Sequence, residues 1–279
     1  MSTLFGGLCD DAALFPPGDA PLTAAVPAHR ALREEFDELV GPFIVPAAQL
    51  DELTSCLDDG PPFGVSLIAA AGTLPAATAR VAADSRLALK AVEVPVLVDA
   101  AAAWAAVQVL DDVLPEGVFA AIEVPRTPSR GAVLDVLVGT GYRAKLRTGG
   151  VTREHFPDEA ELAAALADCQ QRGLALKCTA GLHRALRHTA TETGFEHHGF
   201  LNLLLAADAL ARGASPGAAA ECLAQRDCAT VAGQLRTWSP ERAERARALF
   251  TSFGTCSVLE PVDDLVALGL LPTMERISS

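Results

Sequence analysis

The chain has 279 residues, half of them hydrophobic, and a formal net charge of −13, which allows one large α/β domain or two small ones. No Lys/Arg cluster offers a basic face for nucleic acid, and no stretch approaches the roughly 18 apolar residues of a membrane span. The first residues lack a basic signal-peptide region and the seven cysteines form no CxxC, so we expect a cytoplasmic protein with reduced thiols and no membrane partner. Its alanine-rich, lysine-poor composition is associated with GC-rich bacterial genomes.

Short runs rich in Val, Ile and Phe alternate with alanine-rich helical patterns along most of the chain. We expect strands near residues 7–10, 42–45, 63–70, 87–94, 118–124, 142–147, 174–179 and 250–256. We expect helices near residues 21–40, 47–58, 75–84, 99–113, 128–139 and 158–172. Eight strands separated by helices predict parallel βαβ units closed into a single (β/α)8 TIM barrel over residues 1–279.

One region interrupts this alternation. Between the seventh and eighth strands, helical patterns occur near 199–212, 216–235 and 240–249 without a convincing strand. We therefore predict an all-helical insertion over residues 184–249. It could cover the mouth of the barrel or form a contact between copies in a homo-oligomer.

Charged residues lie inside strands that ought to be apolar. In "YRAKLRTGGV", Arg143, Lys145 and Arg147 share one face, and the apolar residues between them suit the helix layer. In "LALKCTAGLH", the same alternation directs Lys177 into the barrel and Cys178 towards the helices. Both lysines are therefore expected inside the barrel.

Two glutamates stand at matching places near the ends of the preceding strands. Glu93 lies two residues before Pro95, and Glu123 lies two residues before Pro125. Neighbouring strands are about 4.8 Å apart, so these carboxylates should pair with the lysines in alternating sign. Such a cluster is either a structural ion-pair layer or a catalytic site, and its place near the strand ends favours catalysis.

The two lysine strands resemble those of class I aldolases of the deoxyribose-phosphate aldolase type. The resemblance lies in "KLRTGG", "LKCTAGLH" and the "FGTCS" that ends the last strand. It implies a lyase without a cofactor, with Lys145 forming a Schiff base and Lys177 tuning it. Glu93 or Glu123 would then move protons. Arg147 stands where the family has a small residue, and the helical insertion is foreign to that family.

Two other functions use the same residues. Carboxylates on the fourth and fifth strands beside a lysine are similar to enolase-type sites, in which acidic residues hold Mg²⁺ and a lysine moves a proton. The usual third carboxylate on strand three is missing, since "VSLIAAAG" offers only Ser66, although Asp10 or Asp11 could substitute. The remaining alternative is a non-catalytic barrel that binds a ligand.

We expect a small anionic substrate held near the ends of the last strands. Gly149, Gly150 and Gly181 would let backbone N–H groups approach a phosphate or carboxylate, or would simply form tight turns. Arg147 would add a bidentate contact. The remaining substrate-binding candidates are His183, His198 and Asn202. Spacings such as HxH or HxxxH are lacking, so we predict no metal site.

Overall fold

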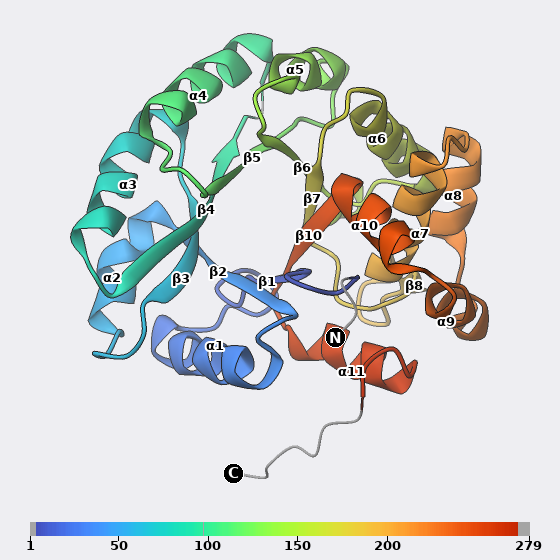
Figure 1. The fold of residues 1–279 in the computed structure, drawn as a ribbon, viewed down its shortest axis with the longest axis horizontal. Helices are drawn as coiled ribbons and strands as arrows, with labels where there is room; N and C mark the ends of the chain where they lie inside the picture. The colour runs from blue at the N-terminus through green and yellow to red at the C-terminus, as the bar shows by residue number, and fades with distance from the viewer. Residues whose placement is uncertain (1–3, 97, 273–279) are drawn as a thin grey trace.

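The computed structural model describes residues 4–96 and 98–272. Its eight parallel barrel strands are hydrogen-bonded in the closed order β1-β10-β7-β6-β5-β4-β3-β2 (Figure 1). These strands are β1 (Cys9–Asp11), β2 (Val40–Pro46), β3 (Phe63–Ile68), β4 (Leu87–Pro95), β5 (Phe119–Glu123), β6 (Arg143–Arg147), β7 (Leu176–Thr179) and β10 (Phe250–Thr255). The predicted (β/α)8 TIM barrel is confirmed.

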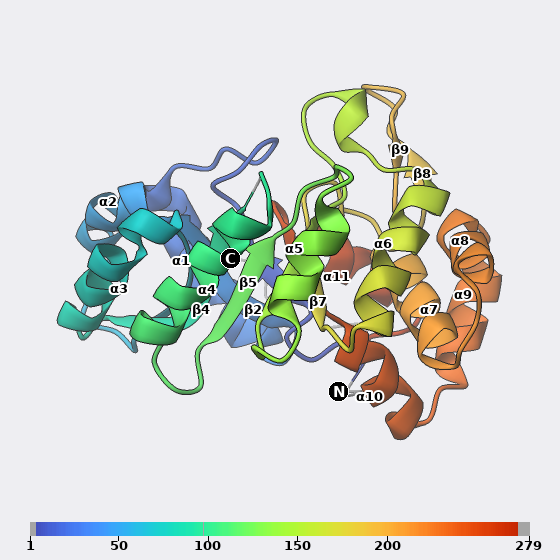
Figure 2. The same ribbon diagram turned by 90° about the horizontal axis from the view of Figure 1, so that it is seen from above.

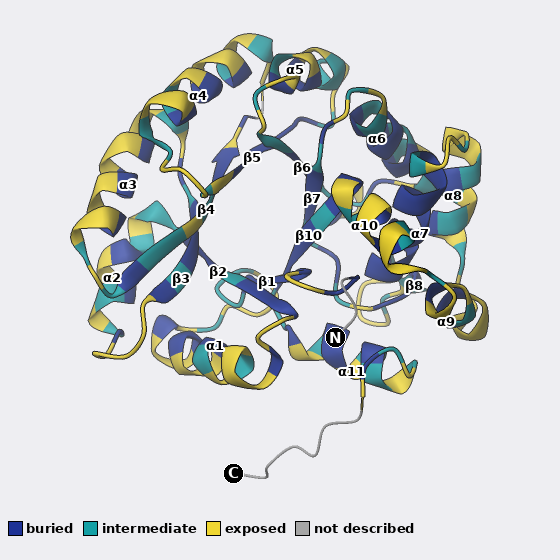
Figure 3. Cartoon of the chain, viewed as in Figure 1, coloured by how far each residue is buried: buried dark blue, intermediate teal, exposed yellow. Residues whose placement is uncertain are grey.

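Helices surround the barrel and bury their apolar faces against it. They are α1 (Leu22–Phe36), α2 (Leu50–Ser55), α3 (Leu74–Ala83), α4 (Ala100–Val113), α5 (Arg130–Leu137), α6 (Glu159–Gln171) and α11 (Leu259–Ala267), with short 3₁₀ turns η1 (Ala47–Gln49), η2 (Ala71–Thr73) and η3 (Arg153–His155). Figure 3 shows buried strands inside and exposed outer surfaces on α3 and α4. Within the described part of the chain, no helix is both long and apolar enough to cross a membrane.

The region between β7 and β10 holds four helices and a small hairpin. The helices are α7 (Phe200–Ala211), α8 (Pro216–Ala224), α9 (Cys228–Arg236) and α10 (Pro240–Leu249), and the hairpin pairs β8 (His188–Thr189) with β9 (Glu196–His197). The insertion is therefore not purely helical, and the helix expected near 216–235 is two helices. Asp227 starts the second of them by accepting a hydrogen bond from the Thr230 amide.

α7 is the central element of this region. Every residue from Phe200 to Leu210 is buried, because α7 contacts β10 on one side and α6, α8 and α10 on the others. Asp208 on α7 is buried and paired with Arg242 at 2.7 Å, which ties α7 to α10. The added helices thus stack outside the barrel, while the β8–β9 hairpin projects at the same end as the β6–α6 loop (Figure 2).

Candidate active site

Six charged side chains of alternating sign follow one another through ion pairs inside the barrel. We call them the charge network: Asp10 on β1, Lys177 on β7, Glu93 on β4, Lys145 on β6, Glu123 on β5 and Arg147 on β6. All but Arg147 are buried. The alternating pairing expected from the sequence is therefore present, and it reaches one strand further, to Asp10.

The first half of the charge network centres on Lys177. Its ammonium donates hydrogen bonds to Asp10 Oδ2 at 2.7 Å and to Glu93 Oε1 at 2.6 Å. Two serine hydroxyls complete this half: Ser252 donates to Asp10 Oδ2 at 2.9 Å, and Ser66 donates to Glu93 Oε1 at 3.0 Å. Lys177 is thus held by two charge-assisted hydrogen bonds whose acceptors are themselves fixed.

The second half centres on Lys145 and is held less tightly. The Lys145 ammonium lies 2.7 Å from Glu93 Oε2 and 3.1 Å from Glu123 Oε2. Glu93 Oε2 is buried but accepts no hydrogen bond of good geometry, so its contact with Lys145 is an ion pair only. Arg147 ends the charge network 3.3 Å from Glu123 Oε1, with 40% of its side chain exposed.

The register of the parallel strands explains this arrangement. Lys145 stands beside Glu123 on one side and beside Lys177 on the other. Glu93, however, is level with Ala121, and Glu123 is level with Pro95. The two glutamates are therefore not at the same height, because equal distance from a proline does not fix the stagger between strands. This offset lets Glu93 lie between the two lysines.

In the charge network, burial and ion pairing shift each pKa in opposite directions, and ion pairing has the larger effect at Lys177 and Glu93. Burial alone would lower the pKa of Lys177, but the carboxylates of Asp10 and Glu93 outweigh it and raise that pKa. Burial would raise the pKa of Glu93, but Lys177 and then Lys145 hold it well below its usual range. At Asp10 burial dominates and the pKa is raised, despite Lys177. Lys177 and Glu93 therefore form a fixed cation and a fixed anion.

The carboxylates do not offer a site suited to Mg²⁺ in this arrangement. Both oxygens of Glu93 face lysine ammonium groups, and those of Glu123 face Lys145 and Arg147. A divalent cation there would lie against positive charge rather than in an open oxygen cage. Across residues 4–96 and 98–272, no three His, Cys, Asp or Glu side chains are grouped to hold a metal ion.

The three glycines proposed for anion binding all lie in tightly packed loops. A Cβ on Gly149 would come within 2.7 Å of the Gly181 Cα, so both loops need glycine for their mutual approach. Gly181 also has a φ of +74°, which favours glycine. A Cβ on Gly150 would lie 2.4 Å from His155 Nδ1. These contacts supply a packing reason for each glycine.

The remaining candidates do not join the charge network. His198 and Asn202 are fully buried in the insertion, where His198 bonds to the Pro157 carbonyl and Asn202 bonds to the backbone of Arg187, Cys222 and Gln225. His183 lies beyond β7, half-buried, with its Nδ1 3.2 Å from Glu260 and 3.6 Å from the Cys256 sulfur. Burial raises the pKa of that Cys256 thiol to about 11, which disfavours the nucleophilic thiolate.

Sequence reasoning underrated three members of the site. Asp10 was weighed only as a metal ligand, although a charged residue in a short buried strand is itself a signal of an inward-facing partner for a lysine. Ser66 and Ser252 both face carboxylates of the charge network. Ser66 stands between Val65 and Leu67 on β3, which indicates its inward direction, but the partners of both serines depend on the closure of the barrel.

The fold and the charge network together define a class: a TIM barrel, an architecture that commonly carries enzymes, with a buried network of carboxylates and lysines at its centre. Comparison with models of known protein families and with curated proteins finds no match for the chain. The charge network itself is therefore the feature that bears on activity.

Proposed function

We propose that the protein is an aldolase-type lyase that acts on a small anionic carbonyl compound through a Schiff base on Lys145. The observation that carries this proposal is the unequal holding of two adjacent lysines. Lys177 donates two hydrogen bonds of 2.6 and 2.7 Å, whereas Lys145 meets its two carboxylates at 2.7 and 3.1 Å in ion pairs without hydrogen-bond geometry. The less constrained amine is the better nucleophile.

Lys177 acts as the electrostatic partner of this nucleophile. Asp10 and Glu93 raise its pKa, so it stays protonated and does not attack a carbonyl itself. It lies beside Lys145 in the register of β6 and β7, with Glu93 between the two ammonium groups. A permanent neighbouring cation is one of the devices that activate a Schiff-base lysine.

Glu123 is the proton acceptor that this chemistry requires. It takes a proton from Lys145 at 3.1 Å, and the freed amine adds to the substrate carbonyl carbon. The carbonyl oxygen then leaves as water with two protons, one that Glu123 took from Lys145 and one from the added amine nitrogen, and the C–N bond becomes an iminium. When the neighbouring C–C bond is cleaved, its electron pair enters the iminium, which becomes an enamine. The hydroxyl on the departing carbon gives its proton to Glu123, and that carbon leaves as the carbonyl group of the released fragment.

Arg147 is the side chain that a substrate entering from the strand carboxyl ends would meet first. It is the most exposed member of the charge network, and its guanidinium already faces a carboxylate, that of Glu123. A substrate carboxylate or phosphate can bind this guanidinium through two parallel hydrogen bonds. Its binding would also loosen Glu123 for proton transfer from Lys145.

Borohydride trapping tests this proposal. The protein is incubated with pyruvate, glyoxylate, acetaldehyde or glyceraldehyde, reduced, and analysed by intact mass and peptide mapping. We expect an adduct on Lys145 with at least one of them, lost in Lys145→Met. The matched variant Lys177→Met should still form an adduct on Lys145, more slowly. Adducts on Lys177, or none with any of the four compounds, would contradict the proposal, and the second result would favour a non-catalytic ligand-binding barrel.

A further inference from the structure

A cavity of about 830 Å³ enters the barrel from the end opposite to Arg147. Its lining includes the first residues of β2, β3, β5 and β6, which are Val40, Phe63, Phe119 and Arg143. Gly7, which precedes β1, lines it as well. The cavity therefore opens at the amino ends of the strands, whereas barrel enzymes place their chemistry at the carboxyl ends.

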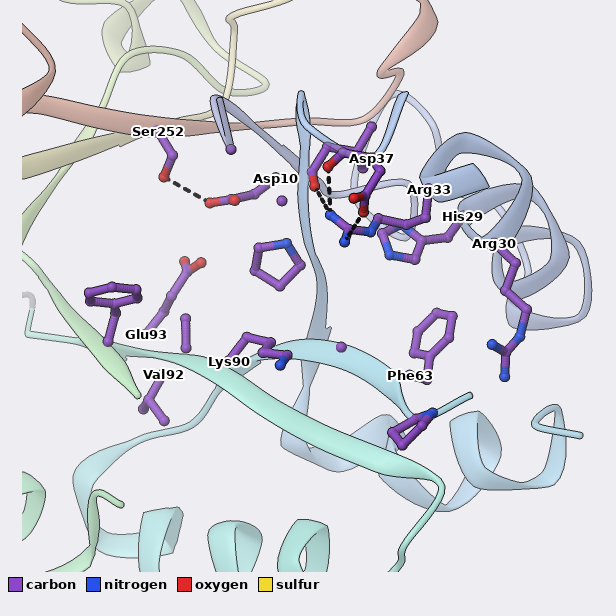
Figure 4. Close-up of a pocket in the computed structure, with 18 of the residues that line it drawn as sticks. Asp10, His29, Arg30, Arg33, Asp37, Phe63, Lys90, Val92, Glu93 and Ser252 are labelled. Atoms are coloured by element: carbon purple, nitrogen blue, oxygen red, sulfur yellow. Dashed lines mark hydrogen bonds and ion pairs between the residues drawn. The ribbon is translucent and has the colours of Figure 1, made fainter. Parts of the chain in front are cut away.

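The inner end of this cavity reaches the charge network from the side of the amino ends of the strands. Asp10, Glu93 and Lys177 line it together with Ser252. Figure 4 shows Asp10, Ser252 and Glu93 on one side of the cavity, with Lys90 nearby. Of the charge network, Lys145, Glu123 and Arg147 are not part of its lining. The cavity thus reaches the half of the charge network that centres on Lys177, and not the half that centres on Lys145.

Two cations of the cavity have no carboxylate partner. Lys90 is exposed and lies where the register between β3 and β4 slips, since Val65 pairs with Leu89 and Ser66 with Ala91. Arg143 is half-buried, and the one hydrogen bond found for its guanidinium is a long one of 3.5 Å to Thr251. Neither side chain forms an ion pair with any residue in 4–96 or 98–272. Charges without partners in a concave site favour an anionic ligand.

The same part of the cavity exposes an aromatic ring. Phe119 is 57% exposed, and the Arg143 guanidinium lies 3.9 Å from its ring centroid. Ala91, Val92 and Ala120 also line this region. A large apolar ring beside Arg143, in a cavity that Lys90 also lines, matches a ligand that has both an apolar body and an anionic group.

The outer part of the cavity is less suited to an anion, because its cations are already neutralised. Arg30 pairs with Asp58 at 2.9 Å, and Arg33 pairs with Asp37. Figure 4 shows Arg33 of α1 paired with Asp37, which follows that helix, well apart from Lys90. The unpaired positive charge is therefore concentrated around Lys90 and Arg143.

We propose that this cavity is a second ligand site, which binds a small organic carboxylate with an aromatic or aliphatic body. The carboxylate group is attracted by Lys90 and Arg143, the two cations of the lining that form no ion pair with a described residue, and the body packs on Phe119. The proposal stands apart from the Schiff-base chemistry, because such a ligand needs no aldehyde or ketone group. It gives the barrel one ligand site at each end of the charge network.

The test uses 8-anilinonaphthalene-1-sulfonate, a fluorescent aromatic anion, and its uncharged counterpart N-phenyl-1-naphthylamine. We expect saturable binding of the anion, displaced by 2-naphthoate, and binding of the uncharged dye at least about tenfold weaker, as expected for the loss of a charged hydrogen-bonding group. The double variant Lys90→Met, Arg143→Met should bind the anionic dye about tenfold or more weakly than the wild type. The control Arg80→Met changes an exposed arginine outside the cavity and should bind like the wild type.

Two further variants keep the test decisive if the double variant fails to fold. Lys90→Glu changes an exposed side chain and reverses its charge, so the folded variant should lose anion binding. Phe119→Ala should weaken the binding of both dyes. Unchanged binding in folded Lys90→Glu, equal affinity for the two dyes, or no saturable binding to the wild type would overturn the proposal. None of these results depends on an adduct at Lys145.

Discussion

The molecule buries two polar networks, and they differ in the groups that accept or donate their hydrogen bonds. In the insertion, the side chain of Asn202 bonds to three backbone groups, and His198 bonds to the Pro157 carbonyl and to Arg187; we call these bonds the insertion network. In the charge network, the partners are other side chains, apart from one long contact between Arg147 and the Gly149 carbonyl.

This difference separates a structural role from a chemical one. Backbone groups cannot leave their places without unfolding the segment, so the insertion network fixes a loop. Side-chain ion pairs can exchange partners or protons while the barrel stays intact. A buried set of interchangeable charges is the kind of arrangement that active sites use. Single substitutions in each network therefore distinguish the two roles.

The charge network should be the more sensitive to loss of one charge. Glu93→Gln leaves the buried ammonium groups of Lys177 and Lys145 without their shared anion. We expect it to lower the free energy of unfolding by about 3–5 kcal/mol. Urea denaturation followed by circular dichroism measures this loss. A loss below about 1 kcal/mol would mean that the charge network is not paired in solution.

The pH dependence of that loss identifies its origin. The pKa of Glu93 is held below its usual range, so its contribution is present above the unfolded value of about 4.3 and is lost as the pH falls through the folded value. The gap in unfolding free energy between wild type and Glu93→Gln should therefore stay constant from pH 7 to about pH 5.5 and narrow below about pH 4. A gap that widens in acid would contradict the pairing.

The insertion network should respond to acid through His198. Burial, with help from Arg187, lowers the pKa of His198 to about 4. An unfolded histidine binds its proton near pH 6.5, so stability falls by about 3 kcal/mol as the pH drops from there to the folded value. The His198 imidazole resonances should titrate near pH 4 in the folded protein. A midpoint near 6.5 would show that the ring is not buried.

An exposed ion pair provides the lower limit of the comparison. Arg80 forms an ion pair with Asp51, and their side chains are 51% and 79% exposed, respectively. Arg80→Ala should change the free energy of unfolding by only about 0–1 kcal/mol, because solvent screens this pair. Measured in the same urea titrations, it serves as the matched control for Glu93→Gln. A loss as large as that of Glu93→Gln would show that charge removal alone, and not burial, determines the effect.

Much of the fold follows from local sequence patterns. All eight barrel strands lie where apolar runs predicted them, and the alternation within "RAKLR" and "LKCT" correctly directs Lys145 and Lys177 inwards. Cys178 is buried outside the charge network, as expected. These features depend on the two-residue period of a strand, which is visible in the sequence.

Features that depend on contacts between distant segments were less predictable. The offset of Glu93 and Glu123 comes from the stagger of β4 and β5, which no local pattern encodes. Asp10 meets Lys177 across 167 positions of sequence, only because β10 brings β1 and β7 together. His198 and Asn202 are polar residues near a predicted helix start, and their bonds to other segments become visible only in the folded insertion.

The protonation state of Lys177 is the property that most directly tests the assignment of Lys145 as the nucleophile. Nitrogen-15 NMR of the lysine Nζ groups, assigned with Lys177→Met, follows this ammonium as the pH is raised. We predict that Lys177 remains protonated beyond about pH 10.4, the ordinary lysine value, because Asp10 and Glu93 raise its pKa. Glu93→Gln should shift its titration to lower pH. Titration of Lys177 at or below the ordinary value in the wild type would contradict the fixed cation on which the assignment of Lys145 as the nucleophile depends.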